Sequence, residues 1–370
     1  MPEVVVFGAA GYTGRLAVAA LAQAGRAVVL AGRDRGRLDE LAGRYPGTRV
    51  AVADATDPAS VRGILRPGDV LVSTVGPFVR YGEAALSGAV DVGAHYVDST
   101  GEAPFVRTVF QEYGERARQA GVVALTAVGY DYVPGNLAGA LAAREAGPDA
   151  RRVDVGYFLT GTGQGMSSGT RASLATGITL PHHAYRNGRL RLEPAARRVR
   201  HFSAPGRRPG FSIGATEQFT LPALYPHLRD VNVYLGWLGN ATRMAQVASY
   251  TQPLLLRLPG GRRRLDERAE RALGRTGAGP DADARAASGS LVVAEAFDGA
   301  GRRLARVDLS GVNGYDLTGR LLAWAATSLA DGAADGAGAL GPVQAFGLDR
   351  LAEATHTAGL TRVESPARLR

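Results

Sequence analysis

The stretch Val4-Val5-Val6-Phe7-Gly8-Ala9-Ala10-Gly11-Tyr12-Thr13-Gly14-Arg15 decides the fold of this chain. In it an apolar run breaks into three glycines at three-residue spacing, and a helical pattern follows at once. Gly8 allows a sharp turn out of the strand, Gly11 lets a phosphate approach the backbone, and Gly14 lets the helix lie close to the sheet. The stretch therefore predicts the strand, turn and helix that begin a dinucleotide-binding domain.

The segment that follows favours NADP(H) over NAD(H). Residues 16–25 have the pattern of a helix that ends at Gly25, and the next apolar strand ends in Ala31-Gly32-Arg33. An NAD-binding unit usually has a carboxylate at this point, where it holds the ribose hydroxyls. Arg33 would bind a 2′-phosphate instead, and a solvated surface arginine is the alternative interpretation. We therefore predict NADP(H) as the cofactor.

The composition excludes several kinds of chemistry. The 370 residues include no cysteine and no lysine, which excludes disulfides, thiolate metal sites, cysteine nucleophiles and lysine Schiff bases. Six scattered histidines without a His-Glu-x-x-His spacing argue against a catalytic metal. No stretch approaches the ~18 uninterrupted apolar residues of a membrane span. Because the chain also starts directly on a strand, we expect a cytoplasmic protein without an integral membrane segment.

The formal net charge of +9 raises the question of an acidic partner. Arginines concentrate in residues 186–208 and again in 262–264. No DNA-binding motif or aromatic stacking platform accompanies them, so we expect no nucleic acid partner. A basic face suits an acidic partner or a phosphorylated substrate, and a solvated loop is the alternative.

The order of elements predicts two domains. Residues 1–130 alternate strands and helices, which indicates a doubly wound parallel sheet of the Rossmann type. Residues 131–335 are expected to form an α+β domain on a largely antiparallel sheet, for the substrate or for oligomerisation. A flexible connection over 331–341 would lead to a C-terminal helix, within 342–370, that packs back on the first domain. The expected strands of the second domain are 152–160, 210–220, 230–235, 290–297 and 304–309, and its expected helices are 166–177 and 241–258.

Several loops of the first domain should face one crevice. In doubly wound sheets, ligands bind beyond the carboxyl ends of the strands. The amides of residues 10–13 would contact the pyrophosphate at a helix N-terminus. Asp54 would approach the adenine or cap a turn, and Gly76 would permit close approach of the nicotinamide ribose. The expected cofactor-binding residues are Gly8, Ala10, Gly11, Tyr12, Thr13, Gly14, Arg33, Asp54, Thr74, Val75, Gly76 and Pro77.

Five motifs, in this order, resemble those of the saccharopine dehydrogenase-like oxidoreductases, nearest the trans-acting enoyl reductase branch of actinobacteria. The similarity covers about residues 1–140 and a short stretch at 167–170. It implies an NADP-binding Rossmann domain, a mixed second domain, and hydride transfer to a C=N bond or to the C=C bond of an acyl chain. Tyr132 and Asn136 replace a Ser and an Asp of the family pattern, so the substrate does not transfer. The motifs are Gly8-Ala9-Ala10-Gly11-Tyr12-Thr13-Gly14, Ala31-Gly32-Arg33, Thr74-Val75-Gly76-Pro77-Phe78 with Tyr81-Gly82, Tyr96-Val97-Asp98-Ser99-Thr100-Gly101-Glu102 and Gly129-Tyr130-Asp131-Tyr132-Val133-Pro134.

A reductase must hold the nicotinamide, exclude water and manage one proton. We expect Tyr132, Asp131 and Tyr81 to be catalytic, with a tyrosine beside Asp131 as the proton donor. Glu102 could instead anchor its loop, and the hydroxyls at 167–170 could instead cap a helix. The residues expected to bind substrate are Phe78, Glu102, Tyr130, Ser167 and Thr170.

The sequence thus predicts an NADPH-dependent reductase of C=C or C=N bonds. Its substrate would be a small molecule or a group bound to an acyl carrier, and its setting would be secondary metabolism. A non-catalytic NADP-binding sensor or scaffold protein is the alternative. A homodimer is left open.

Overall fold

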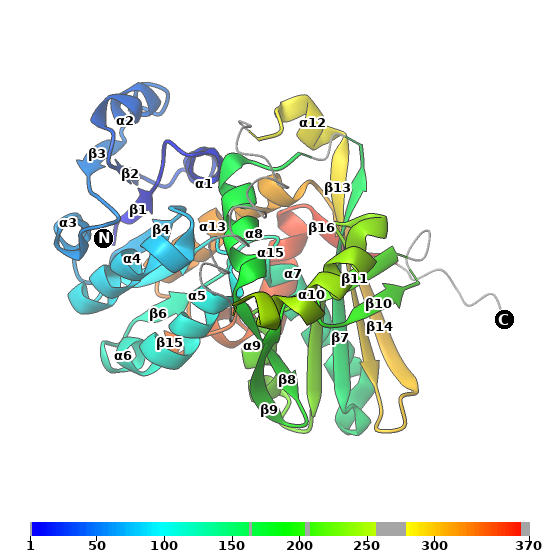
Figure 1. Ribbon diagram of the computed structural model, residues 1–370. Coiled ribbons are helices and arrows are strands. Elements are labelled where there is room, and N and C mark those ends of the chain that lie inside the picture. Colours follow the sequence, from blue (N-terminus) through cyan, green and yellow to red (C-terminus); the bar gives the residue numbers. More distant parts are fainter. Residues whose placement is uncertain (1, 163–164, 204–207, 257–278, 364–370) are drawn as a thin grey trace.

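The computed structural model describes residues 2–162, 165–203, 208–256 and 279–363 of the chain. They form two sheets, with helix α8 (Ser168–Thr179) between them (Figure 1). The first sheet is parallel and has seven strands in the order β15-β6-β5-β4-β1-β2-β3, whereas the second is mixed and largely antiparallel. The predicted fold class is confirmed.

The parallel sheet follows from strands that are apolar along their whole length. Every residue of β1 and β4 is buried, as expected for strands covered on both faces. The strand order reverses between β1 and β4, and ligands bind at this point in such sheets. Its elements are β1 (Val4–Phe7), α1 (Tyr12–Gln23), β2 (Val28–Gly32), α2 (Arg35–Ala42), β3 (Arg49–Val52), α3 (Pro58–Arg62), β4 (Val70–Ser73), α4 (Phe78–Val92), β5 (His95–Asp98), α5 (Ala103–Thr108), the π-helical turn η1 (Val109–Tyr113), α6 (Gly114–Gln119), β6 (Val123–Leu125) and β15 (Gly338–Ala339).

The second sheet is built around β7, which pairs in parallel with β12 and antiparallel with β13. Helix α7 contacts β7, β13 and β14, and a single hydrophobic core joins this region to one face of the first sheet. The elements are α7 (Val133–Ala146), η2 (Gly147–Asp149), β7 (Arg152–Gly161), β8 (Pro181–Arg186), β9 (Arg189–Pro194), β10 (Val199–Phe202), β11 (Arg208–Ile213), α9 (Glu217–Leu224), β12 (Asp230–Leu235), η3 (Gly239–Ala241), α10 (Thr242–Leu256), α12 (Ala282–Ala286), β13 (Ser288–Phe297), β14 (Arg303–Gly311), α13 (Gly314–Ala330), α14 (Pro342–Phe346), α15 (Leu348–Thr357) and β16 (Leu360–Val363).

The chain returns to the first sheet earlier than the sequence predicts. Helix α13, predicted within the second domain, packs on α1 and contacts β1, β4 and β5. Gly319 permits this approach, because a Cβ there would lie 2.9 Å from the Cβ of Leu16. The stretch 331–341, expected to be a flexible connection, contains β15, which extends the first sheet by pairing with β6.

The C-terminal segment also differs from its prediction. Helix α15 contacts α7 and β16, and β16 pairs antiparallel with β14 of the second sheet. Leu351 and Leu360 are both buried in the shared hydrophobic core. The described part of the C-terminal segment therefore adds a strand to the edge of the second sheet, and its helix α15 also contacts α13, the helix that covers the first sheet.

The basic stretch 186–208 is strand, not loop. Its described residues form the end of β8 together with β9, β10 and the start of β11. Some of its arginines have acidic partners: Arg186 Nε lies 3.1 Å from Asp230 Oδ1 of β12, and Arg198 Nη2 lies 2.6 Å from Glu193 Oε1 within the same stretch. The expected strand 210–220 ends early, because α9 begins at Glu217. The second basic stretch, 262–264, lies outside the described residues.

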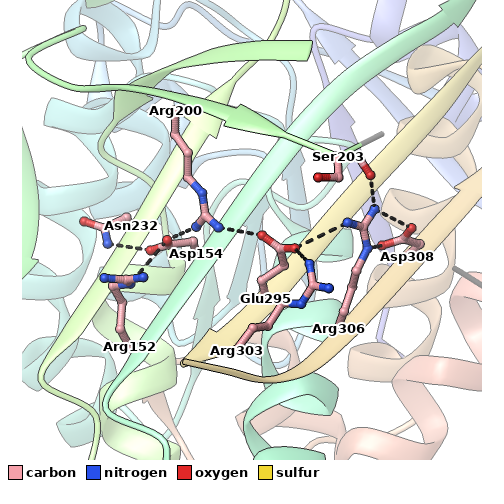
Figure 2. Close-up of polar contacts among 9 residues, drawn as sticks. All are labelled: Arg152, Asp154, Arg200, Ser203, Asn232, Glu295, Arg303, Arg306 and Asp308. Atoms are coloured by element: carbon pink, nitrogen blue, oxygen red, sulfur yellow. Dashed lines mark hydrogen bonds and ion pairs between the residues drawn. The ribbon is translucent and has the colours of Figure 1, made fainter. Parts of the chain in front are cut away.

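A buried network of charges lies on one face of the second sheet (Figure 2). Glu295 on β13 is 3% exposed and accepts from three arginines. Its carboxylate lies 2.5 Å from Arg200 Nη2, 2.5 Å from Arg303 Nη1 and 3.3 Å from Arg306 Nη1. Arg200 also pairs with the buried Asp154 of β7. Charge pairing across strands thus lies beside a buried apolar cluster on this face, formed by Phe158, Phe202, Tyr234, Leu291 and Val293.

None of the helices in the described ranges combines the length and the apolar character needed to cross a membrane.

Candidate active site

The glycine turn after β1 is shaped by close contacts. Gly8 has a φ of +87°, and a Cβ there would lie 2.7 Å from Thr74 Oγ1. A Cβ on Gly14 would lie 2.2 Å from the Gly8 carbonyl oxygen, and the Gly11 amide donates to the same oxygen at 2.8 Å. The turn therefore leaves the N-terminus of α1 open to an anion, as a dinucleotide pyrophosphate requires.

A groove of about 1570 Å³ runs from this turn along the ends of β2, β3 and β4 to the N-terminus of α8. Ten of the twelve residues expected to bind the cofactor line the groove. Gly14 lies instead inside the contact between turn and helix, and Pro77 is the residue before α4. The residues present fit a dinucleotide. Those in the groove are Gly8, Ala10, Gly11, Tyr12, Thr13, Arg33, Asp54, Thr74, Val75 and Gly76.

Two arginines flank the end of the groove beyond β2. Arg33 is exposed there, and Arg37, one helical turn further, donates from Nη2 to the Ala10 carbonyl at 3.2 Å. The sequence prediction missed Arg37, although its position in the first turn of α2 was a usable signal. Asp54 does both things expected of it: it lines the groove and accepts from the Thr56 amide at 2.8 Å, a bond that lowers its pKa.

Two adjoining cavities continue from the groove into the space between the sheets. The first cavity, of about 920 Å³, reaches between α8 and the strands β11 and β12. The second cavity, of about 720 Å³, reaches the start of α13. Trp237, which the sequence prediction missed, lines both. The residues common to the two cavities are Thr13, Ser99, Asp131, Thr170 and Trp237.

Asp131 is the only acidic residue among the described residues that line the two cavities, and none of those residues is an arginine. Its Oδ1 atom is buried and has no hydrogen-bond partner in the described structure. Burial raises the pKa of this carboxyl to about 7. Asp131 is therefore an acid that can hold or release a proton near neutral pH.

The tyrosines expected to act beside Asp131 have engaged hydroxyl groups. Tyr132 lines the first cavity, but its hydroxyl donates to the Gly101 carbonyl at 3.1 Å. Tyr130 lines the second cavity and donates to the Phe158 carbonyl at 2.9 Å. Burial raises the pKa of both well above the usual range. Neither hydroxyl is poised to give up its proton.

Two other expected residues lie apart from the cavities. Tyr81 lines the dinucleotide groove. Glu102 is fully buried and does not line either cavity; it accepts from the Phe78 amide at 2.8 Å and from Ser173 Oγ at 2.6 Å. Burial raises its pKa. Glu102 thus anchors α4 to α8, the alternative considered for it, whereas Phe78 itself lines the first cavity.

Ser167 lines both the groove and the first cavity, and Thr170 lines the two cavities. The Thr170 amide donates to Ser167 Oγ at 3.1 Å, so the expected helix cap exists as well. Both residues also contact Tyr315 of α13, which the sequence prediction missed. Within the described ranges, no group of three or more His, Asp or Glu side chains is placed to hold a metal ion.

Comparison with known proteins agrees with this geometry. A family model described as NAD(P)H-binding matches residues 8–137. The structure matches apo saccharopine dehydrogenase (L-Glu forming) of Saccharomyces cerevisiae with a TM-score of 0.59 at 13% identity, over 99% of this chain and 100% of that one. The family model and the groove together support a nicotinamide dinucleotide as the ligand of the first sheet.

Curated proteins with similar sequences provide a second comparison. A lipid droplet localized protein of Caenorhabditis elegans is 31% identical over 48% of this chain and 45% of its own length. A trans-acting enoyl reductase of Mycobacterium ulcerans is 29% identical over 36% of this chain and 34% of its own. The chain thus matches less than half the length of these curated relatives. The chain is therefore similar in fold to saccharopine dehydrogenase and, over part of its length, similar in sequence to trans-acting enoyl reductases, in agreement with the resemblance carried by the five motifs.

Proposed function

We propose that the protein is an NADPH-dependent reductase that adds a hydride and a proton across the C=C bond of an apolar acyl substrate. The observation that carries this proposal is the lining of the two cavities beside the dinucleotide groove. Leu174, Phe211, Ile213 and Leu235 form an apolar wall, and Asp131 is the single acid among the described lining residues. An acyl chain matches such a wall, because apolar contact replaces water there at no polar cost.

The lining gives less support to reduction of a C=N bond in an amino-acid adduct. Such an imine carries carboxylates, and a buried carboxylate requires a cationic partner. The described lining residues of both cavities include no arginine, the chain has no lysine, and His182 in the first cavity is the one described lining residue that could carry a positive charge. An imine without carboxylates is the form of this alternative that the cavity would admit.

Bound NADPH supplies the hydride. The protein must then place the double bond, exclude water and deliver one proton to the second carbon. Asp131 holds that proton in a water-poor position, with its Oδ1 unpartnered. Release of the proton leaves a carboxylate that is reprotonated from solvent, so each turnover adds one hydride and one proton and converts NADPH to NADP⁺.

The preference for NADPH over NADH rests on Arg33. We predict that Arg33→Ala weakens NADPH binding by roughly 1.5–3 kcal/mol through loss of a charge-assisted hydrogen bond, and weakens NADH binding far less. Titration of both dinucleotides by fluorescence measures the difference. Arg37→Ala is the companion variant, because Arg37 lies at the same end of the groove. Equal losses for the two dinucleotides in Arg33→Ala would contradict the assignment.

The activity is tested by loss of NADPH absorbance against a matched substrate panel. We expect turnover of α,β-unsaturated thioesters with apolar chains, and none of imines that carry carboxylates. Tight NADPH binding without turnover of any compound would instead support the alternative, a non-catalytic sensor or scaffold protein. An acyl carrier as the bearer of the substrate stays a prediction; the net charge of +9 supports it, because it would attract an acidic carrier. Cytoplasmic location, secondary metabolism and a homodimer likewise stay predictions.

A further inference from the structure

Three hydroxyl groups form a chain at the wall of the two cavities. Ser167 precedes α8, Thr170 lies in its first turn, and Tyr315 lies in the first turn of α13. Thr170 Oγ1 is 3.0 Å from Ser167 Oγ and 2.8 Å from the Tyr315 hydroxyl. Two amides hold the ends, since Ser167 N donates to the Tyr315 hydroxyl at 2.8 Å and Thr170 N donates to Ser167 Oγ at 3.1 Å.

The hydrogen count leaves one donor over. Each hydroxyl carries one hydrogen, so the hydroxyl chain has three hydrogens. The two contacts within it use two of them. The two amides donate to the chain and take none of its hydrogens. The described residues offer these hydroxyls no further acceptor. One O–H therefore stays unused, on Ser167, on Thr170 or on Tyr315, according to which atom donates in each of the two contacts.

The unused donor can reach only a few places. Ser167 lines the first cavity, Tyr315 lines the second, and Thr170 lines both, as Asp131 does. The Tyr315 ring packs edge-on against Tyr12 with a centroid distance of 4.9 Å, which holds its hydroxyl beside the glycine turn. Helix α8 points its N-terminus, the positive end of its dipole, at the same place. The chain and the helix together favour negative charge on a bound molecule.

We propose that this hydroxyl chain donates a hydrogen bond to the carbonyl oxygen of the substrate, with Tyr315 as the hydroxyl that donates and therefore as a catalytic residue. The inference rests on the proposed reduction of an unsaturated acyl group. Addition of the hydride to the β-carbon moves the electron pair of the double bond toward the carbonyl oxygen. The spare O–H stabilises the charge there, and no proton leaves the chain. The proton from Asp131 goes to the α-carbon as the C=O bond reforms.

The kinetic test uses the full-length protein and an unsaturated thioester that the wild type reduces. Tyr315→Phe should lower kcat by about 10²-fold, as removal of one such donor does elsewhere, with KM changed by less than about threefold. Tyr225→Phe is the matched control, because its hydroxyl donates to the Ala140 carbonyl, and Tyr225 does not line either cavity. The Tyr315→Phe and Ser167→Ala effects should be less than additive, because both break one chain. Equal kcat in Tyr315→Phe and Tyr225→Phe would overturn the proposal.

A binding measurement separates this inference from the proposed reaction. A saturated octanoyl thioester with an isotope-labelled carbonyl is bound together with NADP⁺, and its C=O stretch is recorded by infrared difference spectroscopy. The stretch should move to lower frequency in the wild type and in Tyr225→Phe, but not in Tyr315→Phe. If no thioester is reduced but the carbonyl stretch shifts in this pattern, the proposed reaction is contradicted and the proposed hydrogen bond is supported. An unshifted carbonyl in the bound wild type would refute the hydrogen bond even if reduction occurs.

Discussion

Asp131→Asn should lower kcat by about 10²–10⁴-fold while NADPH binds as in the wild type. The carboxyl lies in both cavities, its Oδ1 is buried without a partner, and asparagine cannot replace the proton that it gives. Asparagine has almost the same shape, so the cavity should persist. Steady-state kinetics with an unsaturated thioester and a separate NADPH titration measure the two quantities.

The pH dependence gives the sign of the effect. Because burial raises the pKa of Asp131 to about 7, the proton-carrying form dominates below that pH and is lost above it. We therefore expect wild-type kcat to be flat on the acidic side of about pH 7 and to fall by about tenfold per unit on the alkaline side. The kcat of Asp131→Asn should not show this fall on the alkaline side. The same linkage predicts that the variant gains stability relative to the wild type as the pH rises from 3.8, the ordinary pKa of the group, to about 7, and gains no more above that, because the wild type alone must bury a charge there.

A tyrosine variant tests the competing assignment. Tyr132→Phe removes a hydroxyl whose hydrogen is bound to the Gly101 carbonyl. We expect it to retain most of its activity, whereas a collapse of kcat in Tyr132→Phe together with an active Asp131→Asn would restore the tyrosine as the proton donor. The two variants alter neighbouring residues of one loop, so their difference isolates the acid from general damage to the cavity wall.

The dinucleotide unit could be predicted because its signals are local. The spacing of Gly8, Gly11 and Gly14 is dictated by contacts within one turn and its helix, as the short Cβ distances at Gly8 and Gly14 show. Arg33 follows its strand directly, and the loops after β4, β5 and β6 meet because parallel strands share an edge. None of these inferences needed the position of any residue beyond the first sheet.

The missed parts of the site depend on contacts between distant segments. Tyr315 meets Ser167 and Thr170 from a helix about 150 residues further along the chain, and nothing in its neighbourhood marks it as a site residue. Helix α13 is apolar enough to cover either sheet, and only its fit against α1 decides between them. For Glu102 the motif could be recognised in the sequence, but its role could not. The three groups that donate to its carboxylate come from other segments of the chain.

The arginine-rich strands were missed for an electrostatic reason. β9 does alternate arginine and leucine, but most of its residues are exposed, whereas β10 is only four residues long and its Arg200 occupies a position that faces acidic partners. Arg200 on β10 is the clearest case, since it reaches Asp154 on β7 and Glu295 on β13 (Figure 2). From the sequence alone, such a run of arginines suggests a solvated loop, because acidic residues that pair with them lie on distant strands.

Glu295→Ala should lower the free energy of unfolding by about 3–5 kcal/mol, because it leaves three arginines around a buried, uncompensated position. Glu295 is 3% exposed, and its partners reach it at 2.5 to 3.3 Å. Urea denaturation followed by circular dichroism measures the loss. Glu115→Ala is the matched control: Glu115 pairs with Arg118 at the same 2.5 Å, but its side chain is 60% exposed.

Solvent screens the Glu115 pair, so its removal should leave the unfolding free energy almost unchanged at any salt concentration. The Glu295 loss should persist in high salt, because ions do not enter the buried face of the sheet. A small, salt-sensitive loss in Glu295→Ala would mean that water reaches this face and that apolar contacts alone hold the second sheet. The contrast between two glutamates with equal distances and unequal burial therefore measures what burial adds to an ion pair in this fold.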